Sequence, residues 1–496
     1  MYYNSTRNKS VEVTSAQAIN DGISKDGGLF VPEKMPKLDK AFIDEIKGKS
    51  YIERAAAVLK MYLTDFSDDE IYACVNGAYK GTFDNDIPAP LSDMSNGSYI
   101  LELWHGPTCA FKDMALQLLP HLLTRSAKKV GSGKRTVILV ATSGDTGKAA
   151  LEGFKNVENT SIMVFYPECG VSQMQKLQMA TQEGDNVFVC AINGNFDDAQ
   201  SGVKRIFTDK EIAKKLDDNA MAFSSANSIN WGRLLPQIVY YISAYCDLLN
   251  KNPELDSFNV VVPTGNFGNI LAAYYAKMMG VPIAKLICAS NSNNVLTDFI
   301  RTGTYDRNRE FFTTISPSMD ILISSNLERL LYHLSDCDDA LVNEWMTSLS
   351  KTGKYTVNAE VGEKVKDLFY GGCADDAETK AIISKLFKES GYLCDTHTAV
   401  AVTVYNNYVA ETGDTKETVI VSTASPYKFA ADVLDAVSDG ASENVVGVEA
   451  MNALCEKTGV AIPTPLLGLA EKEVRFRKVC EPKDMDEAVF EYLGIK

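Results

Sequence analysis

The chain has 496 residues, 45% of them hydrophobic and 23% charged, which is a globular composition too long for one ordinary core, so we expect two or three domains. Its 65 acidic residues against 49 basic ones give a net charge of -16, which argues against a nucleic-acid partner because phosphate neutralisation needs a basic face. The 11 cysteines form no C-x-x-C pair and only 4 histidines are present, so we expect reduced thiols and no metal. The sequence shows neither the apolar core of a signal peptide nor an apolar run near the roughly 18 residues of a membrane span. We therefore expect a cytoplasmic protein without a membrane partner.

The first hundred residues carry mostly helical patterns. Apolar residues recur with helical spacing over 39–47, 52–64 and 68–79, and one compact turn, KDGGLFVP, occupies 25–32. We therefore expect residues 1–100 to form an N-terminal helical segment that packs on the first α/β unit.

Seven short runs are typical of buried strands. Their apolar positions are nearly continuous rather than alternating, as expected for strands covered on both faces. These runs lie at 99–104, 136–142, 161–167, 186–192, 259–265, 285–290 and 417–424. Helical patterns fall between them, at 112–129, 147–156, 232–250 and 267–279. The alternation of strand and helix predicts an α/β fold with parallel sheets.

A domain boundary is expected near residue 250, where Asn and Pro in NKNPEL interrupt a helical pattern. We assign 101–250 to a smaller α/β domain and 251–496 to a larger one. Residues 330–395 are mainly helical and acidic, and we expect them to form an insertion in the larger domain.

The first of three loops at strand ends follows the run 136–142. Ligands bind beyond the carboxyl ends of strands in open parallel sheets, and here SGDTG, residues 143–147, leads directly into a helix. Small residues let the amides of a helix N-terminus face a carboxylate or a phosphate. A nucleotide P-loop is not favoured, because Thr142 stands where its first glycine is needed and Ala149 follows Lys148. A plain helix cap without a ligand is the alternative.

The second loop is TGNFGN, residues 264–269, again between a strand and a helix. Gly265 and Gly268 would let the backbone approach a phosphate closely. The G-x-G-x-x-G pattern is absent, as is the acidic residue expected about 20 positions later, so a phosphate monoester fits better than a dinucleotide.

The third loop follows the run 417–424. Ser422, Thr423 and Ser425 place hydroxyls at this strand end, where they could bind a ligand heteroatom. A simple turn at Pro426 is the alternative.

Lys112 lies directly after Phe111, at the start of a helical pattern. Burial beside apolar groups would lower the pKa of its amine from about 10.4, and a neutral amine forms a Schiff base with an aldehyde. Pyridoxal phosphate is an aldehyde with a phosphate group, so a lysine, a phosphate loop and a polar strand end are the parts that such an enzyme needs. The alternative is an exposed lysine in the first turn, paired with an acid.

Longer stretches of the chain resemble the threonine synthases, fold-type II pyridoxal-phosphate enzymes, and their length resembles the longer form of that family. The resemblance implies a fold like that of the tryptophan synthase β-subunit, with two parallel-type sheets. It rests on AINDGISKDGGLFVP (18–32), ELWHGPTCAFKDMALQ (102–117), TSGDTG (142–147), FSSANSINWGRLLPQIVYY (223–241), VPTGNFGNI (262–270), SPSMDILISSNLERLL (316–331) and DTHTAVAV (395–402).

The resemblance implies residues that bind pyridoxal 5'-phosphate. Lys112 would hold the cofactor through a Schiff base and then act as general acid and base. Thr423 would face the pyridine nitrogen, and Asp145 the 3'-oxygen, where related enzymes often have Asn. The cofactor phosphate would bind the backbone amides of Gly265, Asn266, Phe267, Gly268 and Asn269.

It also implies residues that bind the substrate, O-phospho-L-homoserine. The loop from Ser143 to Thr146 would bind the substrate carboxylate. An arginine suits a phosphate because its planar guanidinium pairs with two oxygens, although an ion pair on the helix surface is the alternative for Arg233. The substrate-binding residues would be Ser143, Gly144, Thr146, Ser228, Asn230 and Arg233.

The implied reaction converts O-phospho-L-homoserine and water to L-threonine and phosphate. Another lyase of this fold, such as a serine/threonine dehydratase or a cysteine synthase, is an alternative, but its substrate would not require the phosphate-binding block NSINWGR. A catalytically silent paralogue that binds the cofactor is the second alternative. The chain could act as a monomer or a homodimer.

His105, His397 and Asp113 complete the candidates. Either histidine could face the cleft or be a structural residue in the interior. We interpret Asp113 as a charge favoured by a helix N-terminus and not as a catalytic acid.

Overall fold

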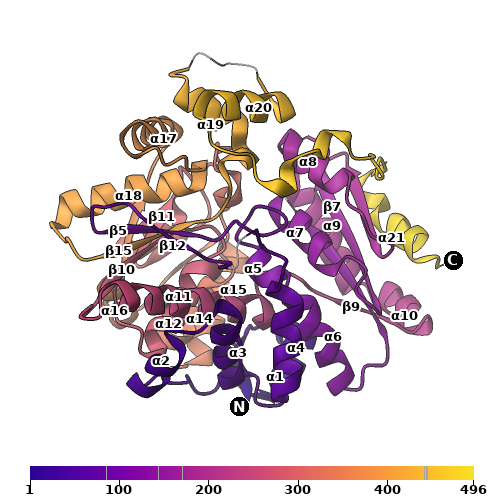
Figure 1. Ribbon diagram of the computed structural model, residues 1–496. Coiled ribbons are helices and arrows are strands. Elements are labelled where there is room, and N and C mark those ends of the chain that lie inside the picture. Colours follow the sequence, from indigo (N-terminus) through magenta and orange to yellow (C-terminus); the bar gives the residue numbers. More distant parts are fainter. Residues whose placement is uncertain (85–86, 143, 170, 441, 443–444, 496) are drawn as a thin grey trace.

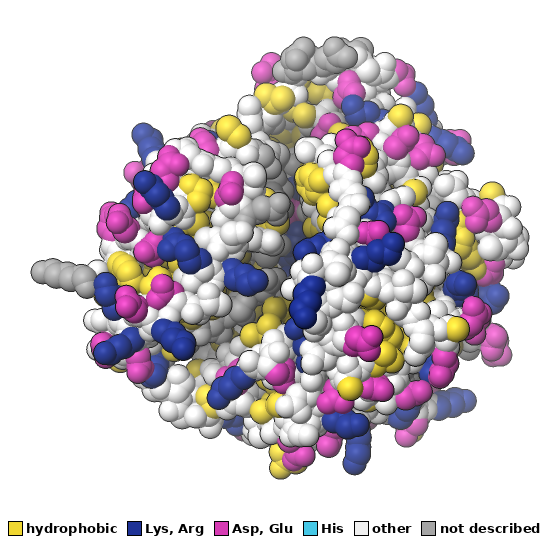
Figure 2. Space-filling view, turned by 180° about the vertical axis from the view of Figure 1, so that it is seen from behind, with side chains coloured by type: hydrophobic (Ala, Val, Ile, Leu, Met, Phe, Trp, Pro, Cys, Tyr) yellow, Lys and Arg dark blue, Asp and Glu magenta, His cyan; other side chains and the backbone are white. Residues whose placement is uncertain are grey.

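The computed structural model describes residues 1–495 apart from 85–86, 143, 170, 441 and 443–444 (Figure 1). Two sheets lie side by side, with helices on both sides of each sheet. The predicted α/β fold with parallel sheets is therefore confirmed. The opposite face of the molecule is hollowed by a groove between two halves, with lysine and arginine side chains along it (Figure 2).

The larger sheet has six described strands, in the order β14-β11-β10-β15-β5-β4. All neighbouring strands run parallel except β4 and β5, which are antiparallel. Every residue of β10 and β15 is buried, which explains their continuous apolar runs. The strands are β4 (Leu91–Asp93), β5 (Ser98–Glu102), β10 (Phe258–Pro263), β11 (Ile283–Ser290), β14 (Phe369–Cys373) and β15 (Thr418–Ser422).

The smaller sheet has five described strands, in the order β16-β8-β7-β6-β9, and all of them are parallel. They are β6 (Arg135–Ala141), β7 (Thr160–Pro167), β8 (Val187–Ile192), β9 (Met221–Ser224) and β16 (Val479–Cys480). Its helices are α7 (Asp145–Phe154), α8 (Gln173–Ala180), α9 (Phe196–Thr208), α10 (Lys210–Asp218) and the C-terminal α21 (Met485–Leu493). All seven predicted strands are thus present, four in the larger sheet and three in the smaller one.

The N-terminal segment contains the predicted helices and, in addition, a small antiparallel sheet. Ser50 and Ser67 begin two of the helices with capping boxes, which satisfy free backbone amides at the helix start. Arg54 is buried and pairs at 2.7 Å with Asp247 of α11 (Trp231–Lys251), which ties the segment to the body of the molecule. The elements are β1 (Tyr3–Ser5), β2 (Asn8–Val13), β3 (Phe30–Pro32), α1 (Ser15–Asp21), α2 (Lys40–Ile46), α3 (Tyr51–Tyr62) and α4 (Asp68–Tyr79).

The predicted helix 112–129 is two helices, α5 (Asp113–Leu116) and α6 (Leu119–Lys129). Pro120 lies in the first turn of α6, where its missing N–H costs nothing, whereas a continuous helix would lose a hydrogen bond there. The break leaves α5 as a short element that carries Lys112 at its start.

The remaining elements complete the larger half. The helices are α11 (Trp231–Lys251), α12 (Gly268–Met279), α13 (Val295–Thr302), α14 (Leu327–Leu334), α15 (Asp339–Thr352), α16 (Ala359–Leu368), α17 (Asp376–Ser390), α18 (Thr396–Thr412), α19 (Ala430–Val437) and α20 (Gly447–Thr458). The short strands β12 (Thr304–Asp306) and β13 (Lys354–Thr356) pair with each other.

The region 330–395, expected to be mainly helical, also contains β14. Its sequence, FYGGC, has two glycines and lacks the apolar run typical of the other strands. A side chain on Gly372 would come within 2.7 Å of Val404 on α18, so the glycine allows close packing of helix on strand.

The predicted division into 1–100, 101–250 and 251–496 stays a prediction. The structure adds that β5 pairs with β15, so residues on both sides of the 100/101 boundary belong to the larger sheet. Among the described helices, none has the length and apolar character that crossing a bilayer requires.

Candidate active site

Lys112 lies where the end of β15 meets the loop before α5. The backbone amide of Phe111 donates to the Thr423 carbonyl at 2.8 Å, and Ala110 forms a bridge with Ala424. The Lys112 side chain is only 12% exposed. Burial lowers the pKa of its amine to about 8, against the opposing charge of Asp145. An amine of this kind is partly neutral near pH 8, as a nucleophile requires.

Asp113 fixes the turn before this lysine. It is fully buried at the start of α5, and its carboxylate accepts hydrogen bonds from the Thr108 amide at 2.8 Å and the Thr108 hydroxyl at 2.7 Å. Burial raises the pKa of Asp113 to about 6. Its observed contacts hold the loop in place.

Asp145 faces Lys112 from the smaller sheet. It is the first residue of α7, and its Oδ2 lies 3.9 Å from the Lys112 amine. Burial raises the pKa of this carboxyl, but the cations Lys428 and Lys112 outweigh burial and hold the pKa well below its usual range. The strand ends of both sheets thus meet in one cleft around Lys112.

The predicted substrate loop before α7 is partly described. Ser143 lies outside the described residues. Gly144 has φ 139°, and a Cβ there would come within 2.3 Å of the Gln175 side chain, so only glycine fits. Thr146 is half-buried in the first turn of α7. Asp145 is the first residue of this 10-residue helix, so the free backbone amides of the helix N-terminus lie on the same side of the cleft as Asp145.

The loop 265–269 joins β10 to α12. Phe267 adopts a left-handed conformation with φ 61°, which turns the backbone into the helix. A Cβ on Gly265 would come within 2.9 Å of the Ser318 carbonyl oxygen. The Lys112 amine lies 3.4 Å from the Ser318 hydroxyl, so Lys112 and this loop contact the same residue.

Asn269 supplies a test of whether a phosphate fits this loop. Its side-chain oxygen accepts hydrogen bonds from Tyr240 at 2.5 Å and Tyr241 at 2.6 Å. Its buried amide nitrogen has no partner among the described residues. A phosphate at the N-terminus of α12 would supply the missing acceptor, so the loop fits an anionic group.

Thr423 follows β15 and is 6% exposed. Its carbonyl is bonded to Phe111, whereas its hydroxyl makes no hydrogen bond with the described residues. Ser422, beside it, accepts from the Trp104 indole at 3.1 Å and is bonded to Thr398 at 2.9 Å. The Thr423 hydroxyl therefore remains available to a ligand near Lys112.

Arg233 is a buried cation in the first turn of α11. It is 3% exposed, and one guanidinium nitrogen donates to the Ala226 carbonyl at 2.6 Å. Its Nε is buried without a partner, and within the described chain no carboxylate lies within salt-bridge distance. Burial lowers the pKa of Arg233 to about 10. The alternative of a surface ion pair is therefore wrong, and an unneutralised cation of this kind fits an anionic ligand.

Ser228 and Asn230 lie in the loop before Arg233. The Ser228 hydroxyl is 3.5 Å from the Asn326 amide, and Asn326 also donates to the Asn266 carbonyl at 3.1 Å. Asn230 is fully buried and caps α11, and its amide donates to the Ile19 and Ser225 carbonyls. The Asn230 side chain is thus engaged within the protein, and its contact with a substrate stays a prediction.

Comparison with known proteins places this cleft in a family. Residues 2–79 match the model of the threonine synthase N terminus, 88–424 that of the pyridoxal-phosphate-dependent enzymes, and 398–489 that of the threonine synthase C-terminal part. The chain belongs to the threonine synthase family. Its fold-type II architecture and its cofactor, pyridoxal phosphate, are thereby confirmed.

Individual relatives agree with this assignment. The chain is 38% identical to the threonine synthase of Schizosaccharomyces pombe, over 86% of this chain and 87% of that one. It is 42% identical to the human protein threonine synthase-like 1, over 85% of this chain, but spans only 58% of the length of that relative. A crystal structure of the pyridoxal-phosphate-bound threonine synthase of Brucella melitensis superposes with a TM-score of 0.86, at 36% identity over 99% of both chains.

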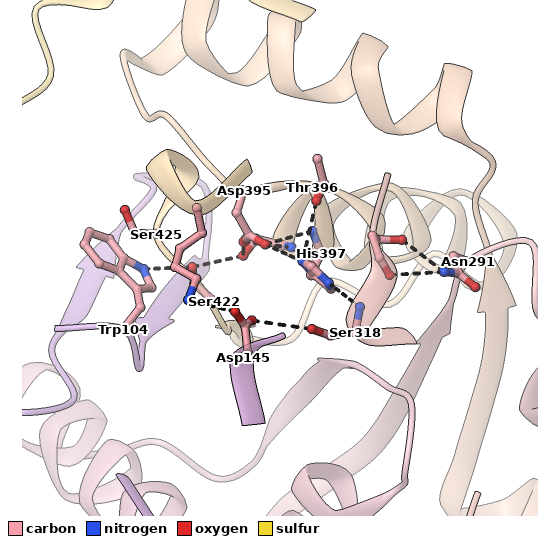
Figure 3. Close-up of polar contacts among 12 residues, drawn as sticks. Trp104, Asp145, Asn291, Ser318, Asp395, Thr396, His397, Ser422 and Ser425 are labelled. Atoms are coloured by element: carbon pink, nitrogen blue, oxygen red, sulfur yellow. Dashed lines mark hydrogen bonds and ion pairs between the residues drawn. The ribbon is translucent and has the colours of Figure 1, made fainter. Parts of the chain in front are cut away.

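Sequence reasoning missed two residues of this site, Ser318 and Lys428. The Ser318 hydroxyl lies 3.5 Å from Asp145, and the Ser318 backbone contacts His397 (Figure 3). Lys428 pairs with the other oxygen of Asp145. The Ser318 amide donates to His397 Nε2 at 3.1 Å, so Nε2 is unprotonated and Nδ1 donates to Asp395 at 2.8 Å. Ser318 lies in the block SPSMDI (316–321) and Lys428 in the stretch SPYKF (425–429), but nothing in the sequence indicated which partner each would contact.

The two candidate histidines differ in position. His397 is buried and holds the segment with Ser318, which contacts Lys112. His105 is bonded to Glu102 at 2.7 Å and stacks on Trp104, with ring centroids 4.2 Å apart. Among the described residues, His397 contacts Ser318 of the Lys112 cleft directly, whereas His105 contacts Glu102 and Trp104.

Proposed function

We propose that this chain converts O-phospho-L-homoserine and water to L-threonine and phosphate, as the last step of threonine biosynthesis. One observation carries the proposal: a buried arginine without a carboxylate partner, Arg233, lies close enough to Lys112 to affect its pKa. A substrate that carries a phosphate would neutralise this charge. The family membership points to the same reaction.

Pyridoxal phosphate, when bound, supplies an electron sink that makes the substrate Cα and Cβ protons acidic. Lys112 would hold it covalently, the loop 265–269 would bind its phosphate with backbone amides, and Thr423 would face its pyridine nitrogen. Asp145 would lie beside its 3'-oxygen. The partnerless amide of Asn269 and the available hydroxyl of Thr423 support these assignments.

The chain's own groups would then bind the substrate and move its protons. The N-terminus of α7, with Gly144 and Thr146, would bind the substrate carboxylate, and Ser143 is assigned here from the sequence. Arg233 and Ser228 would hold the phosphate at Cγ until it leaves, and Asn230 would shape their loop. Lys112 would take the protons from Cα and Cβ and return one to Cγ, before water adds at Cβ. An amine pKa of about 8 suits a group that must both accept and donate protons.

The alternatives differ in what they require of Arg233. A serine/threonine dehydratase or a cysteine synthase acts on substrates without this phosphate. In such an enzyme a buried, unpaired arginine would destabilise the fold without binding the substrate. A silent paralogue that only binds the cofactor would not need Arg233.

One assay tests the proposal directly. The full chain, loaded with pyridoxal phosphate, is given O-phospho-L-homoserine, and phosphate and threonine are measured together. We expect equal amounts of both products. Phosphate without threonine, or ammonia from serine or threonine at a higher rate, would assign the site to another lyase. If none of these substrates gives a product, the chain is a catalytically silent paralogue.

We also propose that the enzyme works in the cytoplasm, without nucleic-acid or membrane partners, as a monomer or a homodimer. The net charge of -16 supports the absence of a nucleic-acid partner. Light scattering during size-exclusion chromatography would decide between one and two copies.

A further inference from the structure

Lys428 is a fully buried cation next to the active site. It lies in the short 3-10 helix Pro426–Phe429 that follows β15, and its side chain has no exposed surface. Its ammonium group contacts three acceptors: Asp145 Oδ1 at 2.7 Å, the Gln178 side-chain oxygen at 2.8 Å and the Thr108 carbonyl at 3.2 Å. An ammonium group has three protons, so each has an acceptor and Lys428 is held as a cation in one position.

The two oxygens of Asp145 face opposite sides. Oδ1 is bonded to Lys428 and to the Gln175 amide at 3.0 Å. Oδ2 faces the cleft, 3.9 Å from the Lys112 amine and 3.5 Å from the Ser318 hydroxyl. A single carboxylate therefore lies between two lysines, one buried behind it and one at the reacting position.

We propose that Lys428 is a positioning residue that, through Asp145, sets the charge on the Lys112 nitrogen. The proposal rests on the role of Lys112 as the cofactor-binding lysine. Without Lys428, the whole carboxylate charge would act on Lys112 and favour its protonated form. With Lys428 in place, its positive charge largely offsets the negative charge of the Asp145 carboxylate. The Lys112 nitrogen then loses its proton more easily and can transfer protons.

The surrounding charges are consistent with this arrangement. The groups that act on Lys112 are Asp113 of α5, Asp145 of α7, Arg233 of α11 and Lys428. Burial lowers the pKa of Lys112, Asp145 raises it, and Lys428 and Arg233 lower it. Of these, Lys428 alone is in direct contact with Asp145 and therefore also fixes where that charge lies.

The test is a spectroscopic pH titration of the enzyme loaded with cofactor, without substrate. The visible absorption band of the linkage to Lys112 reports whether its nitrogen carries a proton. We expect Lys428→Met to raise the midpoint by about one pH unit, because a like charge is removed, and Asp145→Asn to lower it by about one unit, because the opposite charge is removed. Lys428→Arg keeps the charge and should stay near the wild type.

A second readout uses the rate at which pyridoxal phosphate attaches to the full chain after its removal with hydroxylamine. This rate depends on the neutral fraction of Lys112, so near pH 7 Lys428→Met should slow attachment about tenfold. The matched control is Lys148→Met on the same helix as Asp145, because Lys148 is a buried lysine that contacts Glu152 and Gln182 instead. It should shift neither readout.

Opposite shifts in Lys428→Met and Asp145→Asn would support the proposal, because general loosening of the site moves both variants the same way. Unchanged midpoints, or shifts of one sign, would overturn it and leave Lys428 a structural residue. If Lys428→Met does not fold, Asp145→Asn must still lower the midpoint. The titration needs no substrate, so failure of the threonine assay with shifted midpoints would reject the proposed reaction and keep this inference.

Discussion

Two buried cations of the cleft, Lys428 and Arg233, have opposite surroundings. Each of the three protons of Lys428 has an acceptor, one of them a carboxylate. Arg233 has one carbonyl partner and a buried Nε without any, and no carboxylate among the described residues lies within salt-bridge distance of it. Burial of an unpaired charge is costly, so a fold retains one where a ligand brings the counter-charge. The contrast distinguishes a cation that stabilises the site, Lys428, from a cation that can bind an anionic ligand, Arg233.

Removal of the reacting amine should have the largest effect. Lys112→Ala is expected to lower turnover of O-phospho-L-homoserine by about a thousandfold or more, since both the covalent link and the proton carrier are lost. The absorption band of the linkage should vanish as well, as a spectrum of the purified variant would show. Lys128→Ala, on the exposed end of α6, is the control and should keep both. Retention of the band in Lys112→Ala would place the cofactor on another lysine.

The supporting cation should matter most for stability. Lys428→Met leaves Asp145 with a buried negative charge, and we expect the free energy of unfolding to fall by about 3–5 kcal/mol. Urea unfolding of the cofactor-free full chain measures this difference. The double variant Lys428→Met/Asp145→Asn should recover a large part of the loss. An additive double variant would show that the two side chains do not stabilise each other.

The binding cation should show the reverse behaviour. Arg233→Met removes an unpaired buried charge, so the free energy of unfolding of the cofactor-free chain should rise by about 1 kcal/mol or more. With pyridoxal phosphate bound, so that the loop 265–269 is occupied, inorganic phosphate should raise the melting temperature of the wild type but not that of Arg233→Met. A lower stability of the variant without phosphate would mean that Arg233 is a structural residue.

Catalysis should depend on Arg233 by a smaller factor than on Lys112. For Arg233→Ala we expect kcat/KM to fall about a hundredfold, and Arg233→Lys should recover part of the loss, because it keeps the charge but not the two-pronged geometry. Arg205→Ala is the matched control, since Arg205 is exposed and pairs with Asp486 far along the chain. Equal kcat/KM in Arg233→Ala and the wild type would show that Arg233 does not bind the substrate phosphate.

The smallest expected effect is on the free energy of unfolding at acid pH. The pKa of Asp145 is lower in the folded chain than its usual 3.8, so its contribution to stability is present above pH 3.8 and is lost as pH falls through the lower folded value. Between about pH 5 and 2 the unfolding free energy of the wild type should therefore decrease more steeply than that of Asp145→Asn. Parallel curves for the two proteins would show that the ion pair contributes nothing to the pH dependence.

The sequence alone predicted the elements that position Lys112 and the loop 265–269. Runs such as 136–142 and 259–265 are apolar at nearly every position because both faces of their strands are covered, and this pattern is local. By contrast, β14 depends on two glycines that fit against α18, and Pro120 divides a helix that periodicity alone predicts as one.

The contacts within the site could not be predicted in the same way. Lys428 lies more than 280 positions after Asp145, and their contact arises because β15 pairs with β5 while the smaller sheet places α7 opposite. The Asn230 side-chain NH2 donates to the Ile19 carbonyl, which only the tertiary fold brings near. Motifs identified the residue types of the site, whereas the partners came from topology.

The place of β15 in the larger sheet has a consequence for synthesis on the ribosome. Residues 418–422 lie between β10 and β5, and they are made long after both neighbours. Until they emerge, β5 and β10 each have an edge without its final partner, and such edges favour aggregation. A nascent chain that stops before Thr418 should therefore be held by chaperones or degraded, whereas a chain released just beyond α19 would already have the complete sheet.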